Sequence, residues 1–228
     1  DAPQAEHYSA QLKELVSHYR STWHGESWGS VSDGFPVYFT QLPSWGTPQS
    51  EPVEGMEASW AVSRESMQKV SQEVYNTGMA VSIDTGDAIE LHPKNKKPIG
   101  LRHAYLALGK TYRFPIVHEG PIFDEFSKDG PKVVLRFEST GSGLMAGRKG
   151  KIDSFAIAGK DRAWYWADAR IDQDSLILSS PKVKNPIAVR YAWAMNPSGR
   201  NLLYNKEGFP ASPFRTDDWP LFDPKAEV

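Results

Sequence analysis

The spacing of apolar residues changes about half-way along this chain of 228 residues. Up to about residue 112, longer segments with apolar side chains at three- and four-residue intervals alternate with short apolar runs. Beyond that point, short alternating runs are separated by Gly, Asp, Asn and Pro. The first pattern is typical of helices that cover a parallel sheet, and the second of antiparallel strands. The sequence therefore predicts an α/β unit followed by a β-rich unit.

Five elements are predicted in the first unit, in the order helix, strand, helix, strand, helix. The second helix is predicted to end at Asn76-Thr-Gly78, because glycine tolerates the left-handed conformation that often follows the last turn of a helix. In order along the chain, the elements span residues 8–20, 36–42, 57–75, 79–83 and 99–109. The expected buried stripes are Leu12, Leu15, Val16 and Tyr19 on the first helix, and Leu101, Ala104, Tyr105 and Leu108 on the third.

The second unit is predicted to be an antiparallel β-sandwich. Residues 196–228 show no period and are rich in Pro, Gly, Asn and Asp, so we expect an ordered extended loop or a tail there. The length suits two modest domains, which we place at residues 1–113 and 114–228. The predicted strands are 133–138, 155–158, 163–171, 175–179 and 187–193.

Composition argues against several classes of function. The 26 basic and 28 acidic residues nearly balance, so a nucleic-acid partner is not expected. No run approaches the roughly 20 apolar residues that span a bilayer. The chain has no cysteine, and its six histidines show no metal-binding spacing, so neither a metal nor another cofactor is expected. The eight tryptophans suit stacking on sugar rings as well as filling a core.

The chemistry-bearing segment runs from Asp84 to Lys96, between a predicted strand and a predicted helix. Loops at the carboxyl ends of parallel strands are where α/β proteins place catalytic groups. The imidazole of His92 can pass a proton from a serine hydroxyl to a leaving group if a carboxylate holds its other nitrogen. Glu90, Asp87 and Asp84 are the nearby acids. In the alternative interpretation, His92 caps the following helix and the acids are solvated.

The Glu-Leu-His-Pro run at residues 90–93 resembles the last catalytic block of the sialate O-acetylesterase family, a branch of the SGNH (GDSL-like) hydrolases. Lys94-Asn-Lys96, Gly100 and Arg102 continue the resemblance. Further blocks are similar to the family in the same order, and the similarity covers essentially the whole chain. These blocks are Gly-Ser-Gly-Leu at 141–144, Phe-Ala-Ile-Ala-Gly at 155–159, and the segments 180–186, 189–193 and 203–217.

This resemblance implies the carboxyl-terminal part of a three-layer αβα SGNH domain, followed by a jelly-roll-like sandwich. It implies hydrolysis of acetyl esters on a carbohydrate, such as a 9-O-acetylated sialic acid or an acetylated xylan. The protein would be secreted or periplasmic, or lysosomal in a eukaryote. The family's serine nucleophile and oxyanion hole should precede Asp1, so an amino-terminal half or a companion chain would supply the serine. The rival hypothesis is a carbohydrate-binding or scaffold protein with an inactive α/β half.

The resemblance assigns the catalytic histidine to His92. The family usually has aspartate two places before this histidine, where the chain has Glu90, and other SGNH sequences have the acid three places before it, where the chain has Ile89. Glu90 is therefore the predicted orienting acid and Asp87 the alternative. Ser27 is not expected to be a nucleophile, because no apolar strand precedes it, and Ser142 is expected in a hairpin turn.

Substrate contacts are predicted for Gln41, at the carboxyl end of the first predicted strand, and for Trp45, just after it, because they could bind sugar hydroxyls and stack on a sugar ring. A buried glutamine and a surface-loop tryptophan are the equally open alternative. Arg102 either pairs with a loop carboxylate, which we favour, or meets an anionic sugar. Arg215 and Tyr204 are candidates to fold back onto the α/β unit.

Overall fold

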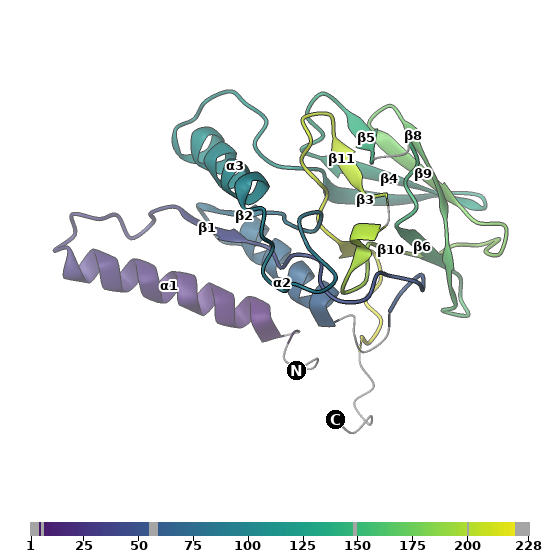
Figure 1. Ribbon diagram of the computed structural model, residues 1–228, viewed down its shortest axis with the longest axis horizontal. Helices are drawn as coiled ribbons and strands as arrows, with labels where there is room; N and C mark the ends of the chain where they lie inside the picture. Colours follow the sequence, from purple (N-terminus) through teal and green to yellow (C-terminus); the bar gives the residue numbers. More distant parts are fainter. Residues whose placement is uncertain (1–4, 6, 55–58, 148–149, 200, 222–228) are drawn as a thin grey trace, which may run out of the picture.

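The computed structural model describes residues 5, 7–54, 59–147, 150–199 and 201–221. A small helix-covered sheet lies beside a larger antiparallel β-rich part (Figure 1). The mixed α/β composition and the antiparallel strands that the sequence predicts are both present.

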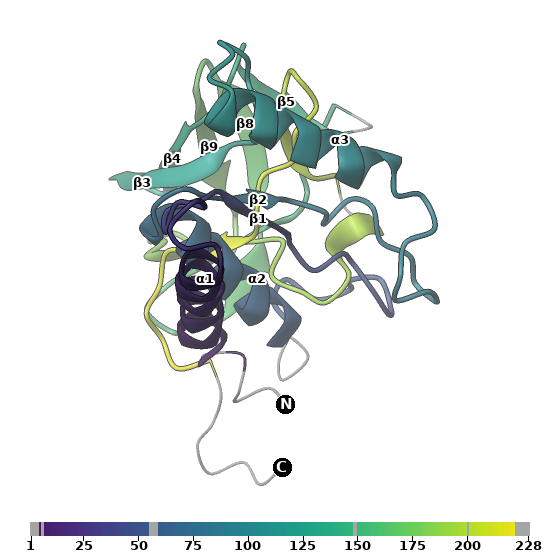
Figure 2. The ribbon, with the colours of Figure 1, turned by 90° about the vertical axis from the view of Figure 1, so that its left-hand side faces the viewer.

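The α/β part follows the predicted order of elements. Strand β1 (Val37–Thr40) pairs in parallel with β2 (Thr77–Ala80), with Val37 opposite Thr77. Helices α1 (Tyr8–Glu26) and α2 (Ser59–Glu73) lie on one face of this pair, and α3 (Lys97–Leu106) lies on the other (Figure 2). A turn of π-helix, η3 (Ala107–Thr111), continues α3. The predicted start of the second helix at Glu57 lies outside the described residues.

Helix α1 continues past the predicted end at Arg20, and only part of its predicted stripe is buried. The guanidinium of Arg20 donates to the carbonyls of Phe35, Tyr75 and Asn76, which fixes this turn of the helix against the neighbouring loops. Leu12 and Val16 are buried as predicted. The predicted burial of Leu15 and Tyr19 is wrong, because their side chains are 45% and 48% exposed.

The predicted buried face of α3 is also wrong. Leu101, Ala104, Tyr105 and Leu108 are all exposed. The helix instead directs the side chains of Arg102 and Leu106 toward the protein interior, and both are buried. The apolar stripe therefore faces outward, although its period is helical as expected.

The β-rich part contains two four-stranded antiparallel sheets and one strand pair. The first sheet has the order β12 (Phe214–Arg215), β10 (Ala188–Tyr191), β6 (Phe155–Ala158), β7 (Trp164–Trp166). The second has the order β3 (Ile122–Asp129), β4 (Lys132–Glu138), β9 (Ser175–Ser179), β8 (Asp168–Asp172). The pair joins β11 (Leu203–Asn205) to β5 (Leu144–Ala146), and a 3-10 turn, η4, spans Pro197–Gly199.

Both four-stranded sheets bury side chains in one hydrophobic core. Leu135 and Leu176 enter it from the second sheet, and Phe155 and Val189 from the first, each without solvent exposure. Ile83, which follows β2, is buried in the same core. The α/β part is therefore joined to the β-rich part by shared apolar packing as well as by the chain. The predicted boundary between residues 113 and 114 falls in the segment after η3.

Several strand predictions need correction. The single strand predicted for residues 163–171 is two strands in different sheets, β7 and β8, because the chain turns at the buried Ala167 between them. The predictions missed β3, β5, β11 and β12. The described residues of the carboxyl-terminal segment, 196–199 and 201–221, are more than the extended loop or tail that the sequence predicts, because they contribute β11 and β12 to the sheets. Its last residues, 222–228, lie outside the described part of the chain.

Candidate active-site loop

The loop with His92 follows β2, beside the loop that follows β1. An isolated parallel bridge joins Trp45 to Asp87. The indole Nε1 of Trp45 donates to the carbonyl of Ile89 at 3.3 Å, and Ser44 Oγ donates to the carbonyl of Ile83. The chain segments after two parallel strands therefore lie together at the carboxyl edge of the sheet, which is where the sequence predicts them.

The close approach of these two loops depends on Gly86. A Cβ atom at this position would lie 1.8 Å from the carbonyl oxygen of Ser44. Any larger residue would therefore push the loops apart. The glycine lets the backbone of the loop with His92 pack directly against the backbone that follows β1.

His92 and Glu90 both lie on the exposed part of this loop. Within the described residues, neither the imidazole of His92 nor the carboxylate of Glu90 forms a hydrogen bond or an ion pair. The alternative that His92 caps the following helix is wrong, because α3 begins at Lys97 and its N-cap is Lys96. Both side chains are therefore accessible from solvent.

The other two acids of the loop are already engaged. Asp87 Oδ1 accepts hydrogen bonds from the amides of Ile89 at 2.8 Å and Glu90 at 3.0 Å, and these bonds lower the pKa of its carboxyl. Asp84 pairs with Arg102 and accepts a hydrogen bond from the hydroxyl of Tyr204 at 3.3 Å. Of the three acids near His92, only Glu90 has a carboxylate without a partner among the described residues.

Arg102 has the structural role that the sequence favours. Its guanidinium lies 2.6 and 2.7 Å from the two carboxylate oxygens of Asp84, and it also donates to the carbonyl of Val81. Its side chain is 10% exposed. The predicted contact with substrate is therefore not supported at this position, because the donors are directed at the loop itself.

Gln41 and Trp45 differ in their access to solvent. Gln41 is 1% exposed and its Nε2 donates to Ser212 Oγ at 2.6 Å, so it ties the end of β1 to the carboxyl-terminal segment. This geometry favours a structural role over the predicted contact with sugar hydroxyls. Trp45 is half-buried and packs against Trp60, with ring centroids 5.8 Å apart. Its ring borders the loop with His92 and stays a candidate for substrate contact.

Arg64, which the sequence reasoning did not single out, positions the loop after β1. It is fully buried on α2 and donates to the carbonyls of Leu42 and Pro43, and to those of Ala194 and Met195 in the β-rich part. Burial lowers the pKa of its guanidinium, and the charge of Glu54 opposes that shift. Its place on α2, three residues before Met67 and six before Val70, both of which are buried, was the available signal.

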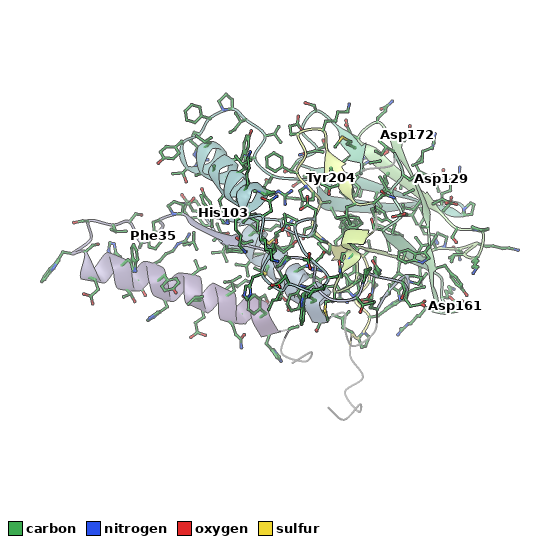
Figure 3. The ribbon with its side chains drawn as sticks, in the orientation of Figure 1. Phe35, His103, Asp129, Asp161, Asp172 and Tyr204 are labelled. Atoms are coloured by element: carbon green, nitrogen blue, oxygen red, sulfur yellow. The ribbon has the colours of Figure 1, made fainter. Side chains whose placement is uncertain are left out.

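His103 of α3 also contributes to this region. Its Nε2 is hydrogen-bonded to Thr40 Oγ1, at the end of β1, at 2.8 Å. Burial lowers the pKa of this imidazole. Figure 3 shows His103 on α3 and Tyr204 at the edge of the β-rich part that faces this helix. The contact of Tyr204 with Asp84 and that of Arg215 with Glu65 of α2, at 3.1 Å, show that both residues fold back onto the α/β part.

Neither serine considered in the sequence has the environment of a nucleophile. Ser27 is the C-cap of α1, and its hydroxyl donates to the carbonyl of His24. Ser142 lies in the turn between β4 and β5, and its hydroxyl donates to Glu207. Within the described residues, no three histidine or acidic side chains converge as a metal site requires. No helix in that part of the chain has the length and apolar character to cross a membrane.

The comparisons with known proteins agree with one another. A sialate O-acetylesterase of Mus musculus is 26% identical over an alignment of 219 positions, which covers 91% of this chain and 40% of that protein. A crystal structure of a carbohydrate acetylesterase from Xanthomonas citri matches 94% of this chain with a TM-score of 0.82 and 35% identity. The resemblance to the sialate O-acetylesterase family is confirmed. No protein-family model matches the chain.

The match to these acetylesterases includes both parts of the fold. Because 94% of the chain is matched, the match extends over both the α/β part and the β-rich part. The chain spans 40% of the mouse sialate O-acetylesterase and 47% of the Xanthomonas enzyme, so it corresponds to less than half of either relative.

Proposed function

We propose that this chain is the histidine-bearing part of a carbohydrate O-acetylesterase whose serine nucleophile comes from an upstream segment or a partner chain. The names of both relatives support an acetylesterase. The observation that carries the proposal is the loop after β2, in which His92 and Glu90 are exposed at the carboxyl edge of parallel strands and have no other partner in the described chain.

In the proposed reaction, the serine hydroxyl attacks the acetyl carbonyl while His92 accepts its proton. The imidazolium then donates this proton to the sugar oxygen, which leaves as a free hydroxyl. Water attacks the acetyl-serine with His92 again acting as base, and acetate is released. The carboxylate of Glu90 accepts a hydrogen bond from the other ring nitrogen and stabilises the imidazolium. Glu90 suits this role better than Asp87, because two backbone amides already occupy Asp87.

The outer surface of the α/β part supports the need for another polypeptide segment. Strands β1 and β2 pair with each other and with no further strand among the described residues, so β1 leaves a sheet edge open. Large apolar side chains are also exposed on the helices of this part of the fold. They are Leu15, Tyr19 and Trp23 on α1, and Leu101, Tyr105 and Leu108 on α3 and η3. We propose that the added segment covers these apolar side chains as well as the open edge. If the isolated chain proves monomeric, compact and cooperatively folded, this part of the proposal fails.

For the acyl donor, we propose an acetylated sialic acid, as the name of the mouse relative suggests, with acetylated xylan as the alternative. Arg102, the predicted partner for an anionic sugar, is occupied by Asp84, so its charge does not favour the acidic sugar. Acetate release from 9-O-acetylated sialic acid and from acetylated xylan, measured side by side, would distinguish these substrates.

A fluorophosphonate probe, which labels activated serines, tests the source of the nucleophile. We expect no labelling of the isolated 228-residue chain. In the active assembly, we expect one labelled serine outside this sequence, identified by peptide mass spectrometry, and a loss of labelling with His92→Ala. Stoichiometric labelling of Ser27, Ser142 or any other serine of this chain would overturn the proposal.

A further inference from the structure

Asp84 begins the loop that contains His92, and its carboxylate is held by both parts of the fold. From α3, the guanidinium of Arg102 donates to Oδ1 and Oδ2 at 2.6 and 2.7 Å. From β11, at the edge of the β-rich part that faces α3, the hydroxyl of Tyr204 donates to Oδ2 at 3.3 Å (Figure 3). Tyr204 therefore connects the β-rich part directly to the start of the candidate active-site loop.

The strand that carries Tyr204 is anchored on both sides of this residue. The amide of Leu203 donates at 2.9 Å to the hydroxyl of Tyr191, which is fully buried in the core that the two four-stranded sheets share. Asn205 is fully buried, and its Nδ2 donates to the carbonyl of Glu119 at 2.9 Å. Strand β11 also pairs with β5. The backbone at Tyr204 therefore has little freedom to move away from Asp84.

Further contacts fix the loop beyond Asp84. Gly86 packs directly on the backbone that follows β1, because it has no Cβ to collide with the carbonyl of Ser44. The carboxylate of Asp87 accepts hydrogen bonds from the amides of residues 89 and 90. A displacement at Asp84 would therefore be carried along the loop instead of being absorbed by slack backbone.

The backbone of His92 is restricted on its other side by a proline. Pro93 follows His92 directly and is buried. Proline disfavours the helical conformation for the residue before it and confines that residue to extended conformations. The imidazole is therefore exposed on a backbone whose two neighbouring segments are both fixed.

The loop after β1 also has support from the β-rich part. Asn196 Nδ2 donates to the carbonyl of Gly46 at 2.6 Å, and the carbonyl of Asn196 accepts the amide of Gln49 at 2.9 Å. Both loops at the carboxyl edge of the parallel strands are thus tied to the β-rich part, and the tie of the loop with His92 includes Tyr204.

We propose that Tyr204 is a positioning residue for the esterase reaction, because its hydrogen bond to Asp84 holds the loop where the imidazole of His92 meets the serine hydroxyl. This inference rests on the proposed function. Tyr204 acts through Asp84 and not on the substrate. Loss of its hydroxyl should therefore slow the chemical step and leave substrate binding unchanged.

Tyr204→Phe, introduced into the active assembly that contains this chain, tests the proposal because it removes only the hydroxyl. We expect kcat for p-nitrophenyl acetate to fall about fivefold or more, while KM changes less than about twofold. Tyr38→Phe is the matched control. It also removes a hydrogen-bonded hydroxyl, whose partner is Thr111 Oγ1 of η3 at 2.6 Å, and it should leave kcat unchanged.

Amide hydrogen exchange of the same assemblies, followed by mass spectrometry, measures the loop itself. Tyr204→Phe should speed exchange in the peptide that spans residues 84–92 about threefold or more, because one hydrogen bond that opposes local opening is lost. Exchange in the helices should stay unchanged. Tyr38→Phe should not affect the 84–92 peptide.

The proposal is overturned if Tyr204→Phe keeps the kcat and the loop exchange of the unchanged protein, or if it raises KM and leaves kcat unchanged. It is also overturned if both variants lower kcat equally, or if Tyr204→Phe fails to assemble where Tyr38→Phe does. His92→Ala in the same series separates the two proposals. An active His92→Ala assembly refutes the proposed function, whereas an inactive one beside an unimpaired Tyr204→Phe assembly refutes only the role of Tyr204.

Discussion

Arg102 and Asp84 form a two-pronged ion pair that joins α3 to the start of the candidate active-site loop, with nitrogen to oxygen distances of 2.6 and 2.7 Å. The side chains are 10% and 18% exposed, so the pair is largely removed from water. Removing one partner from such a pair leaves the other charge uncompensated. The orientation of the loop therefore depends on a contact that the sequence motif alone does not reveal.

Asp84→Asn should lower the free energy of unfolding by about 3 kcal/mol, because the guanidinium of Arg102 stays buried without a counter-charge. Arg136→Ala is the control. Arg136 pairs with Glu125 at 3.4 Å, but both side chains are more than half exposed, so its loss should cost under about 1 kcal/mol. Urea denaturation of the active assembly that contains each variant measures both values. Equal losses of unfolding free energy in the two variants would show that burial does not make the ion pair of Arg102 and Asp84 more stabilising than an exposed pair.

Gly86→Ala should destabilise the protein by about 1–3 kcal/mol and reduce esterase activity, because the new Cβ would collide with the carbonyl of Ser44. Gly100→Ala is the control, since a Cβ there meets nothing within 4 Å. In helix α3 that change should be neutral or stabilising by up to about 1 kcal/mol. Thermal denaturation and the hydrolysis rate, measured on the same samples, would show whether the two loops must touch. An unimpaired Gly86→Ala variant would contradict the predicted collision.

The stability of the fold should decrease as the pH falls below about 6.5, in part through His103. Burial lowers the pKa of this imidazole in the folded chain, so the unfolded chain binds protons more readily in this range. Each proton taken up by the unfolded state shifts the equilibrium toward unfolding, until the pH also falls below the folded pKa. His103→Gln removes the titrating group and should flatten the profile. Urea denaturation between about pH 5 and pH 7.5 measures the unfolding free energy across this range. The same dependence on pH in the variant and the unchanged protein would show that His103 does not contribute to it.

Glu90→Gln should lower the turnover number of the active assembly about tenfold or more, because an amide cannot stabilise the imidazolium as a carboxylate does. Asp87→Asn should have a much smaller effect, since an amide oxygen can still accept the bonds from Ile89 and Glu90. Steady-state kinetics on both variants decide between these acids. A large loss with Asp87→Asn alone would assign the role to Asp87, and no such loss in either variant would exclude both.

The helical period identified the helices but not the faces that they bury. Leu12 and Val16 are buried as expected, whereas Leu15 and Tyr19 on the same predicted stripe are exposed. Periodicity reports that a helix has an apolar face, and burial depends on which neighbour covers it. On α3, the protein instead buries Arg102, whose partner Asp84 is 18 residues away in the chain.

The polar residues that hold the loops in place were harder to predict. The contacts of Arg64 with Ala194 and Met195 cross about 130 residues, and Gln41 meets Ser212 across 171. No local pattern encodes such partners. The place of the loop with His92 was predictable, because its strand and its acids are neighbours in the sequence, whereas the contact of Gly86 with Ser44 was not.

The most direct test of the account is the hydrolysis of p-nitrophenyl acetate by the active assembly that contains this chain, with His92→Ala compared against His18→Ala. His18 is an exposed histidine on α1 and serves as the matched control. The account predicts that His92→Ala lowers the turnover number by about a thousandfold or more, while His18→Ala leaves it nearly unchanged. A His92→Ala assembly that hydrolyses the ester at the rate of the unchanged protein would contradict it.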